Sequence, residues 1–552
     1  MGTPTTGTGE ELNYDFGFNN SQQNGNIAGM RWRSKGDGEQ RAYGFGYDNV
    51  NRLMKGDFTQ YATSAWNTSA GLDFSLKSMT YDHNGNINKM NQMGIKLTSS
   101  TLIDSLVYSY NTNSNKLNYV TDKVNDTTAH IGDFIEINNN TTQDYWYDGN
   151  GNLNKDNNKN ITSITYNYLN LPTVITVAGK GTITYTYDAS GNKLKKVTVD
   201  TTTNPDKTTM TDYLGGFVYL NDTLQFIGQE EGRARPKRAN YSDTMFYDYF
   251  EKDHLGNVRV VLTDEKHQDS YPAATLENNT AALNTEKSYY AINLSDTIST
   301  SRIASWTTTS GNNYANNNGN PPYNNNPYAN TTATSAIVYK LNGNTGNKTG
   351  LGITLRVMSG DIVDVFGKSF YHLNTGQTPV NTYPITSVLS AFINAFTGTS
   401  TISGAGKGAT GAALNGSLPT TNGLNNWLGG VPNPSGNIPK AYINWILFDE
   451  QFKPVAGGSG FDLVNAIPDA VKSHHGTVNI NRNGYLYVYC SNESNVDLFF
   501  DNLQVIHTRG PLLEETHYYP FGLTMSGISS KAAGELQNKY LYNGKEKQAN
   551  EF

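Results

Sequence analysis

The chain has 552 residues, of which only 16% are charged and 11% are aromatic, and it contains 54 glycines and 36 tyrosines. This length allows several domains, the aromatic content is too high for a disordered chain, and the scattered net charge of −7 leaves no basic face for nucleic acid. Tyr and Thr favour strands, and Gly and Asn favour the tight turns between them, so the composition predicts an ordered all-β protein.

Residues 1–29 form an N-terminal lead-in that lacks both the basic and the apolar region of a signal peptide. No apolar stretch of the chain approaches the ~20 residues of a membrane span. The chain therefore either stays inside the cell or is an internal fragment of a longer exported protein. The repeats that follow favour the second alternative.

A Tyr-Asp pair recurs after residue 30, followed at a fixed distance by Gly-Asn and then by an apolar residue. Looser copies begin at Tyr47 and Tyr110, and a degenerate copy begins at Tyr166. Such pairs also arise by chance in a chain rich in Tyr, Gly and Asn, but three copies with the same internal spacing argue against chance. The motif residues of these three copies are Tyr81, Asp82, Gly85 and Asn86; Tyr147, Asp148, Gly151 and Asn152; and Tyr187, Asp188, Gly191 and Asn192.

Each copy predicts a β-hairpin. Ile183, Tyr185 and Tyr187 alternate along the sequence and therefore share one face of a strand. The Asp can accept hydrogen bonds from turn amides, the Gly-Asn pair tolerates positive φ, and the apolar residue starts the return strand. One hairpin is too small to stand alone, so we expect neighbouring hairpins to stack into a continuous sheet.

A basic cluster around Pro236 follows the repeats. It consists of Arg233, Arg235, Lys237 and Arg238. We interpret it as a solvated loop, with a processing or docking site as the alternative.

Two further groups of motifs frame the second half of the chain. The first is Tyr247-Asp248-Tyr249 followed by Asp253-His254-Leu255-Gly256-Asn257-Val258-Arg259. The second comprises Tyr518-Tyr519-Pro520-Phe521-Gly522-Leu523 and Tyr540-Leu541-Tyr542-Asn543-Gly544. With the repeats, these motifs make the sequence resemble the RHS/YD-repeat family and its conserved core, in a version most similar to those of Bacteroidetes. The resemblance covers residues 30–265 and 510–552.

The resemblance implies a long β-sheet that spirals into a hollow shell and is exported across the outer membrane or to the cell surface. In many members the shell encloses a C-terminal toxin that an aspartyl self-cleavage site in the core sets free. The implied partners are a toxin or effector cargo, the remaining part of the same protein, and components of a secretion machinery or of the outer membrane. This sequence stops at Phe552, before the expected cleavage motif, so we assign it neither self-cleavage nor a toxin.

Residues 270–509 separate the two core segments and contain no Tyr-Asp repeat. They open with an Asn/Gly/Pro-rich loop at Gly311–Pro327, carry one helix candidate at Ile385–Phe396, and include a small-residue loop at Gly404–Gly416. The strand candidates are Thr334–Leu341, Leu351–Met358, Asp361–Phe366 with Lys368–Leu373, Ala441–Asp449, Thr477–Ile480, Gly484–Ser491 and Val496–Ile506. Short strands separated by turns predict a jelly-roll-like β-sandwich inserted in the core.

The predicted organisation is thus a lead-in at 1–29, a repeat shell with the first part of the core at 30–269, an inserted sandwich at 270–509, and a resumed core at 510–552. The end of the sandwich resembles the last strand of carbohydrate-binding modules, which implies a structural Ca²⁺ with Asp501 as a ligand. Trp306, Trp427 and Trp445 are candidate glycan contacts, with Tyr442 as a further aromatic. The alternative for each ring is a place in the core.

Reactive chemistry is sparse in the sequence. Cys490 stands alone and is predicted to be a small buried apolar residue. The segment Gly404–Thr410 fails the phosphate-loop template, and His474-His475 is predicted to lie in a surface turn. Glu514-Glu515 is predicted to accept hydrogen bonds or to carry surface charge. No Gly-x-Ser-x-Gly or His-Glu-x-x-His motif occurs, so we predict no enzymatic activity.

The sequence therefore predicts a structural shell or scaffold that encloses or presents a C-terminal toxin or effector. The alternative is a cell-surface adhesin that binds glycans or a partner through the inserted sandwich. A polysaccharide-cleaving enzyme is a third hypothesis, for which we find no matched pair of carboxylates.

Overall fold

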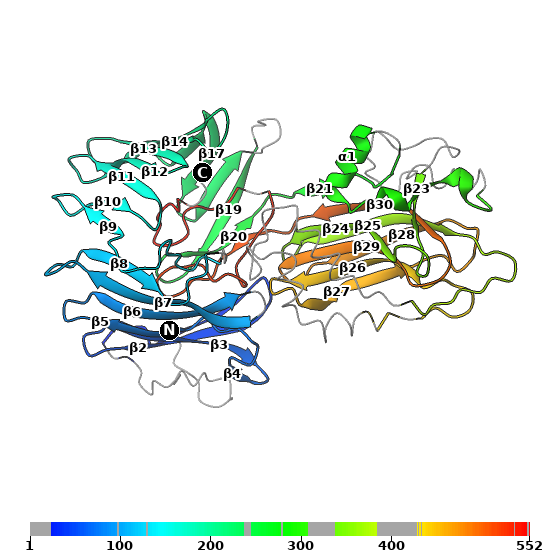
Figure 1. Cartoon of the computed structure of the whole chain (residues 1–552), viewed down its shortest axis with the longest axis horizontal. Coiled ribbons are helices and arrows are strands. Elements are labelled where there is room, and N and C mark those ends of the chain that lie inside the picture. The colour runs from blue at the N-terminus through cyan, green and yellow to red at the C-terminus, as the bar shows by residue number, and fades with distance from the viewer. Residues whose placement is uncertain are drawn as a thin grey trace. The chain divides into compact units, whose positions relative to one another are not determined.

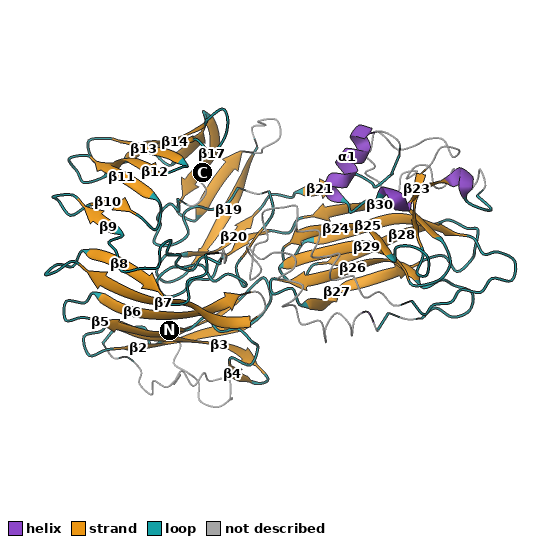
Figure 2. Cartoon of the chain, viewed as in Figure 1, coloured by secondary structure: helices purple, strands orange, loops and turns teal. Residues whose placement is uncertain are grey.

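The computed structural model describes residues 22, 24–96, 99–127, 131–236, 244–277, 280–306, 337–383, 428, 430–431, 433–534, 536–548 and 551–552. The described chain is almost entirely β-structure, which confirms the predicted all-β class (Figure 2). It divides into two compact units. Unit 1 comprises residues 1–265, 513–529 and 536–552, and unit 2 comprises residues 266–512 and 530–535.

Unit 1 begins with an eight-stranded antiparallel sheet, drawn in blue in Figure 1. Its strands follow one another in sequence order, as expected for stacked hairpins, and β4 pairs with β3 at one side. They are β1 (Gly29–Arg33), β2 (Gln40–Tyr47), β3 (Leu53–Ala62), β4 (Ala65–Asn67), β5 (Leu76–Tyr81), β6 (Ile87–Lys96), β7 (Ser99–Tyr110) and β8 (Leu117–Asp122).

A second, longer sheet of unit 1 continues the same meander from β9 to β20, and β31, a strand from the C-terminal region, pairs with β20. Its strands are β9 (Tyr145–Tyr147), β10 (Leu153–Asp156), β11 (Ile161–Tyr166), β12 (Pro172–Val177), β13 (Gly181–Tyr187), β14 (Lys193–Asp200), β15 (Lys207–Leu214), β16 (Phe217–Leu220), β17 (Thr223–Gln229), β18 (Gly232–Pro236), β19 (Met245–Lys252), β20 (Val258–Thr263) and β31 (Leu512–Glu515). The C-terminal segments, drawn in red, run between the two sheets of unit 1 (Figure 1).

The repeat motif forms the turn of each hairpin. In the copy at Tyr147, the Oδ1 atom of Asp148 accepts hydrogen bonds from the amides of Asn150 and Asn152 at 2.9 and 2.8 Å. Its Oδ2 atom accepts a third bond from the Asn152 side chain at 3.0 Å. Gly151 has a φ of 88°, in the left-handed region that favours glycine. The copies at Asp82 and Asp188 have the same three bonds.

The tyrosine of each motif ties one hairpin to the one before it. The Tyr147 hydroxyl donates to the carbonyl of Leu117, the apolar residue that opens the preceding return strand, at 3.1 Å. The same bond joins Tyr81 to Leu53, Tyr110 to Ile87, Tyr166 to Leu153, and Tyr187 to Pro172. The fixed spacing of the motif therefore serves two purposes, since it closes a turn and sets the register between neighbouring hairpins.

We expect Tyr147→Phe to lower the free energy of unfolding by about 1 kcal/mol, because it removes a hydrogen bond and leaves the Leu117 carbonyl without that donor. Urea denaturation of the full chain measures the change. Tyr168→Phe is the matched control, since the Tyr168 side chain is 79% exposed and lies in a turn. Equal stability of the two variants would contradict the role of the tyrosine ladder.

Unit 2 is a sandwich of two antiparallel sheets. One sheet has the order β22-β23-β30-β25-β28 with β21 beside β30, and the other has the order β24-β29-β26-β27. The strands are β21 (Gln268–Ser270), β22 (Thr297–Ser299), β23 (Ile337–Leu341), β24 (Thr349–Val357), β25 (Ile362–Tyr371), β26 (Ala441–Asp449), β27 (Pro454–Leu463), β28 (Lys472–Asn479), β29 (Gly484–Asn492) and β30 (Leu498–Thr508). The short strand β32 (Ser530–Lys531) belongs to neither sheet of the sandwich. Buried aliphatic side chains from both sheets, such as Val365 and Val488, form its core.

The sandwich differs from the sequence prediction in several elements. The two strand candidates at 361–373 form the single strand β25. Strand β27 is absent from the prediction, as are helix α1 (Thr280–Tyr289) and the 3-10 turns η1 (Leu294–Asp296) and η2 (Thr300–Arg302). The expected helix at Ile385–Phe396 and the loops at Gly311–Pro327 and Gly404–Gly416 lie outside the described residues.

Cys490 is confirmed as a buried residue of the sandwich core, where burial holds the pKa of its thiol well above the ordinary value. Among the helices that the structure describes, none has both the length and the apolar character needed to span a membrane.

Candidate functional site

The C-terminal residues of unit 1 cover one face of the repeat sheet. Tyr185, Lys196 and Thr211 lie opposite one another on β13, β14 and β15, so their side chains share that face. All three are buried, whereas Thr186 on the other face is exposed. The glutamates that meet this face, Glu546 and Glu551, are supplied by the last residues of the chain.

A buried ionic network holds these residues in place. The Nζ atom of Lys196 donates to Glu546 at 3.0 Å, to Gln548 at 3.1 Å and to Glu551 at 3.0 Å. Glu546 also accepts from Lys193 at 2.7 Å and from the Tyr213 hydroxyl at 2.9 Å. Burial would raise the pKa of Glu546, but the hydrogen bonds and charges of Lys193 and Lys196 outweigh it and lower that pKa to about 2.

A second buried network lies nearby on β18 and β19. The carboxylate of Asp248 accepts from Nε of Arg233 at 2.7 Å and from Nε of Arg235 at 3.0 Å, and the three residues are 1–3% exposed. Arg233 also donates to the carbonyls of Leu536 and Gln537. The predicted solvated loop is therefore wrong for Arg233 and Arg235, because a carboxylate on the adjacent strand pairs with both guanidinium groups. Lys237 and Arg238 lie outside the described residues.

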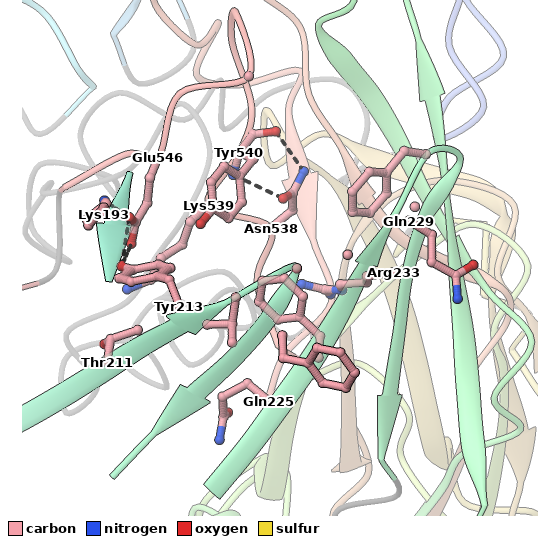
Figure 3. Close-up of a pocket in the computed structure, with 18 of the residues that line it drawn as sticks. Lys193, Thr211, Tyr213, Gln225, Gln229, Arg233, Asn538, Lys539, Tyr540 and Glu546 are labelled. Carbon is pink, nitrogen blue, oxygen red and sulfur yellow. Dashed lines mark hydrogen bonds and ion pairs between the residues drawn. The ribbon is translucent and has the colours of Figure 1, made fainter. Parts of the chain in front are cut away.

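Between the two networks lies a cavity of about 780 Å³. Strands β14–β20 form one wall, and residues 536–546 form the other (Figure 3). Its apolar lining includes Phe217, Phe226, Phe250 and Tyr540. The charged side chains Lys193, Arg233 and Glu546 reach this cavity, and each already has an ionic partner. A cavity of this size and composition can hold apolar or aromatic groups.

The core motifs pack against one another. Asp253 closes a turn with the hydrogen bonds of the repeat, since its Oδ1 accepts from the amides of Leu255 and Asn257 at 3.0 Å, and Gly256 has a φ of 81°. The Asn257 side-chain oxygen then accepts from the amide of Asn543 at 2.9 Å. The motif is predicted as a separate signature of the core, but its geometry is that of one more repeat turn.

The resumed core packs along the same turn. Arg259 pairs with Asp253 at 2.8 Å and lies 4.8 Å above the ring of Tyr518, whose hydroxyl donates to the carbonyl of Val258. Tyr519 donates to the carbonyl of Met93 in the first sheet. Of the remaining motif residues, Leu255 and Phe521 are 59% and 51% exposed, and His254 lies in the Asp253 turn. Pro520 lies near Gly56, and Gly522 has a φ of 90° and lies against the ring of Tyr542.

Glu514 and Glu515 are buried hydrogen-bond acceptors, one of the two roles predicted for them. Glu514 accepts from the amide of Asn538, and Glu515 accepts from the amides of Lys35 and Gly36. Both are less than 5% exposed, so the alternative of surface charge is wrong.

The candidate glycan contacts in unit 2 are not gathered at one place. Trp306 packs edge-on against Phe370 with ring centroids 5.3 Å apart. Trp445 on β26 lies over Gly460 and Gly476, where an added Cβ would meet its ring at 2.8 and 2.5 Å, and Tyr442 is buried. Trp427 lies outside the described residues. Glycan binding stays a prediction.

Asp501 is a buried residue of β30, and burial raises the pKa of its carboxyl well above the ordinary value. Its two oxygens accept hydrogen bonds from the amide and the side chain of Asn502. In the described part of the chain, no group of three or more His, Cys, Asp or Glu side chains is arranged to hold a metal ion. The structural Ca²⁺ at Asp501 therefore stays a prediction without a second ligand.

The predicted surface turn at His474 is wrong, because His474 lies in β28 and is 1% exposed. Its Nε2 lies 2.7 Å from Oγ of Ser369, and its Nδ1 lies 2.7 Å from Oδ2 of Asp462 on the opposite sheet. This order of groups is the one used by serine hydrolases. Ser369 is also 1% exposed, however, so a substrate has no access to its hydroxyl and the network joins the two sheets instead.

Burial lowers the pKa of His474, although the hydrogen bond and charge of Asp462 oppose this effect. A His whose folded-state pKa is depressed contributes stability that is complete above the unfolded pKa of about 6.5. That contribution is lost as the pH falls from this value through the folded-state pKa. We expect the melting temperature of unit 2 to fall between pH 7 and pH 5, and His474→Gln to reduce this dependence. His475→Gln, at a half-exposed position, is the matched control and should leave it unchanged.

No family model matches the chain, and no curated protein matches it either. Among solved structures, a TcdB2-TccC3-TEV crystal structure is 14% identical, covers 44% of this chain and 15% of that chain, and has a TM-score of 0.23. The Photorhabdus luminescens Tc holotoxin pore is 14% identical, with 42% and 15% covered and a TM-score of 0.21.

A third solved structure aligns in a similar way. It is the CBM22-1-CBM22-2 tandem domain of Paenibacillus barcinonensis Xyn10C, which is 10% identical, covers 45% of this chain and 47% of that chain, and has a TM-score of 0.21. The chain thus spans less than a sixth of the toxin chains it matches. Scores this low describe a partial likeness and carry no functional conclusion.

Proposed function

We propose that this chain is a structural shell segment of an exported RHS/YD-repeat protein, and that it encloses or presents a toxin or effector polypeptide. The observation that carries the proposal is the buried attachment of the C-terminal segment to one face of the repeat sheet. The motif resemblance described for residues 30–265 and 510–552 supplies the family. The proposed partners are the cargo and the rest of the same protein, and the proposed location is outside the cell or at its surface.

The geometry of this face fits contact with a polypeptide. The repeat sheet holds an extended segment of the chain through ion pairs, while the adjoining cavity presents aromatic rings. A partly folded polypeptide exposes apolar side chains, and burial of such groups against aromatic walls is favourable. The charged groups at the cavity have partners already, so the proposal assigns them to holding the segment and assigns no catalytic role to this face.

Protease protection of a fused reporter tests the proposal. An unstructured, protease-sensitive segment follows Phe552 in one fusion protein and precedes Met1 in a second, matched fusion. We expect cleavage of the reporter after Phe552 to be slower by about tenfold or more, because the shell segment shields it from the protease. Equal cleavage rates in the two fusions would overturn the proposal.

A further inference from the structure

Three carboxyl groups lie together in unit 1 beneath the segment 131–136. Asp104 is on β7, Asp122 ends β8, and Asp133 belongs to the segment itself. The three residues are 2%, 0% and 9% exposed. Such deep burial of several acidic groups is unusual, since a carboxylate away from water needs compensating partners.

These carboxyl groups have fewer partners than their burial requires. Oδ1 of Asp104 accepts from the amide of Phe134 at 2.8 Å, and its Oδ2 accepts from the Gln92 side chain at 3.4 Å. Oδ1 of Asp122 accepts from the amides of Ser105 and Val124 at 2.9 and 3.1 Å. Oδ2 of Asp122 and Oδ1 of Asp133 are buried and have no hydrogen-bond partner. A buried carboxylate oxygen without a protein donor is costly in the charged form, so this site is sensitive to the charge that it holds.

The surroundings add more negative charge than positive charge. Lys96 faces Asp133, and its ammonium also forms an ion pair with Asp126. The other titratable groups that face the three carboxyls and the adjacent Tyr519 are Asp73, Glu136, Tyr43 and Tyr108. Burial and the mutual repulsion of the carboxylates together raise the pKa of Asp104 to about 7, and burial with the charge of Asp122 raises that of Asp133 to about 6.

The cluster lies where residues 513–529 meet the first sheet. A Cβ added to Gly132 would lie 3.2 Å from Leu523, so the segment 131–136 packs against residues 513–529. The Tyr519 hydroxyl donates to the carbonyl of Met93 at 2.8 Å, and its ring packs against Phe74. Charge on Asp104 and Asp133 is felt at this hydroxyl. The packing of both segments is therefore coupled to the charge of the cluster.

We propose that Asp104 and Asp133, packed beside Asp122, form a proton-controlled latch that tightens the segments 131–136 and 513–529 against the first sheet when protons bind. A protonated carboxyl can donate a hydrogen bond, which is what the two unpartnered oxygens lack. Loss of the protons leaves repelling carboxylates in a site that water does not reach, so the segments loosen. The latch goes beyond the proposed shell function and does not depend on what the shell contains.

The sign of the pH effect follows from the direction of the pKa shifts. Between the unfolded value of about 4 and the folded values of about 6 and 7, the closed state binds more protons than the open state. The closed state is therefore favoured at pH 5 and loses this advantage as the pH rises to 8. Glu546 does not titrate in this window, since its pKa is about 2.

Hydrogen exchange of the full chain at pH 5 and pH 8, corrected for the intrinsic rate at each pH, tests the latch. We expect protection of peptides from 131–136 and 513–529 to fall by about tenfold from pH 5 to pH 8, while strands β13 and β14 keep theirs. In the double variant Asp104→Asn and Asp133→Asn, protection of the two segments should no longer depend on pH. Asp212→Asn, at a half-buried ion pair with Lys195, is the matched control and should behave as the wild type.

Two results would overturn the latch: pH-independent protection of both segments in the wild-type chain, or an unchanged pH response in the double variant. The wild-type measurement decides the matter even where the double variant does not fold. The single variant Asp133→Asn then serves as the second measurement, and its response to pH should be smaller than that of the wild type.

Discussion

Replacing Lys196 by methionine is expected to lower the free energy of unfolding by about 3–5 kcal/mol, the range for breaking a buried ion pair by removing one partner. The Lys196 side chain is 3% exposed and donates to Glu546, Gln548 and Glu551. Methionine keeps the apolar stem but removes the ammonium, so two glutamates that are less than 10% exposed lose a cation. The loss should appear in urea denaturation at pH 7.

The neighbouring residue provides the control. Lys195 is on the opposite face of β14, is 40% exposed, and pairs with Asp212 at 3.2 Å. Lys195→Met should change the free energy of unfolding by less than about 1 kcal/mol, because exposed ion pairs contribute little. Hydrogen exchange of residues 536–548 should increase in the Lys196 variant and not in the Lys195 variant. Similar losses in both variants would show that the ionic network does not hold the C-terminal segment.

The same network predicts an acid sensitivity. The folded-state pKa of Glu546 is lowered to about 2, so its contribution to stability is complete above the ordinary value of 4.5 and is lost as the pH falls toward 2. This direction is opposite to that of the Asp104 cluster, which loses stability as the pH rises. Of these two sites, the Asp104 cluster titrates between pH 5 and pH 8, and Glu546 titrates below pH 4.5. Measurements in the two pH ranges therefore separate their contributions.

Local chemistry could be predicted from the sequence, because each repeat turn is closed by residues that lie within five positions of one another. Asp148, Gly151 and Asn152 occupy the turn in the way that their side chains and φ preferences require. The ionic network could not be predicted in this way. Lys196 and Glu551 are 355 residues apart, and a single sequence contains no signal that pairs one lysine with one distant glutamate.

Two errors have a physical cause that the sequence partly shows. Strand β27, which is absent from the prediction, carries Gly457, Gly458 and Gly460, and glycine has a low strand propensity. Leu447 fills the space where a side chain of Gly458 would lie, and Trp445 fills the space beside Gly460. Arg233 and Arg235 read as solvated charges because they adjoin Pro236. Their alternation with period two, across a hairpin from Asp248, is the signal that points to one shared, buried face.

The second large effect is expected at that face. Asp248→Asn should lower the free energy of unfolding by about 3–5 kcal/mol, because it leaves the buried guanidinium groups of Arg233 and Arg235 without their shared carboxylate. The amide has nearly the same size, so the loss reports the missing charge. Asp212→Asn is the matched control, since Asp212 pairs with the exposed Lys195 and should cost less than about 1 kcal/mol.

A double-mutant cycle separates the pairing from other effects of the substitution. If the carboxylate acts through Arg233, then Arg233→Gln in the Asp248→Asn background should cost less than Arg233→Gln alone, by about 1–3 kcal/mol. Arg233 also donates to the carbonyls of Leu536 and Gln537, so the Asp248 variant should lose hydrogen-exchange protection in residues 536–541. An additive cycle would contradict the pairing of Asp248 with Arg233. If stability falls but the hydrogen-exchange protection of residues 536–541 does not, then Asp248 stabilises β18 and β19 and has no part in attaching residues 536–541.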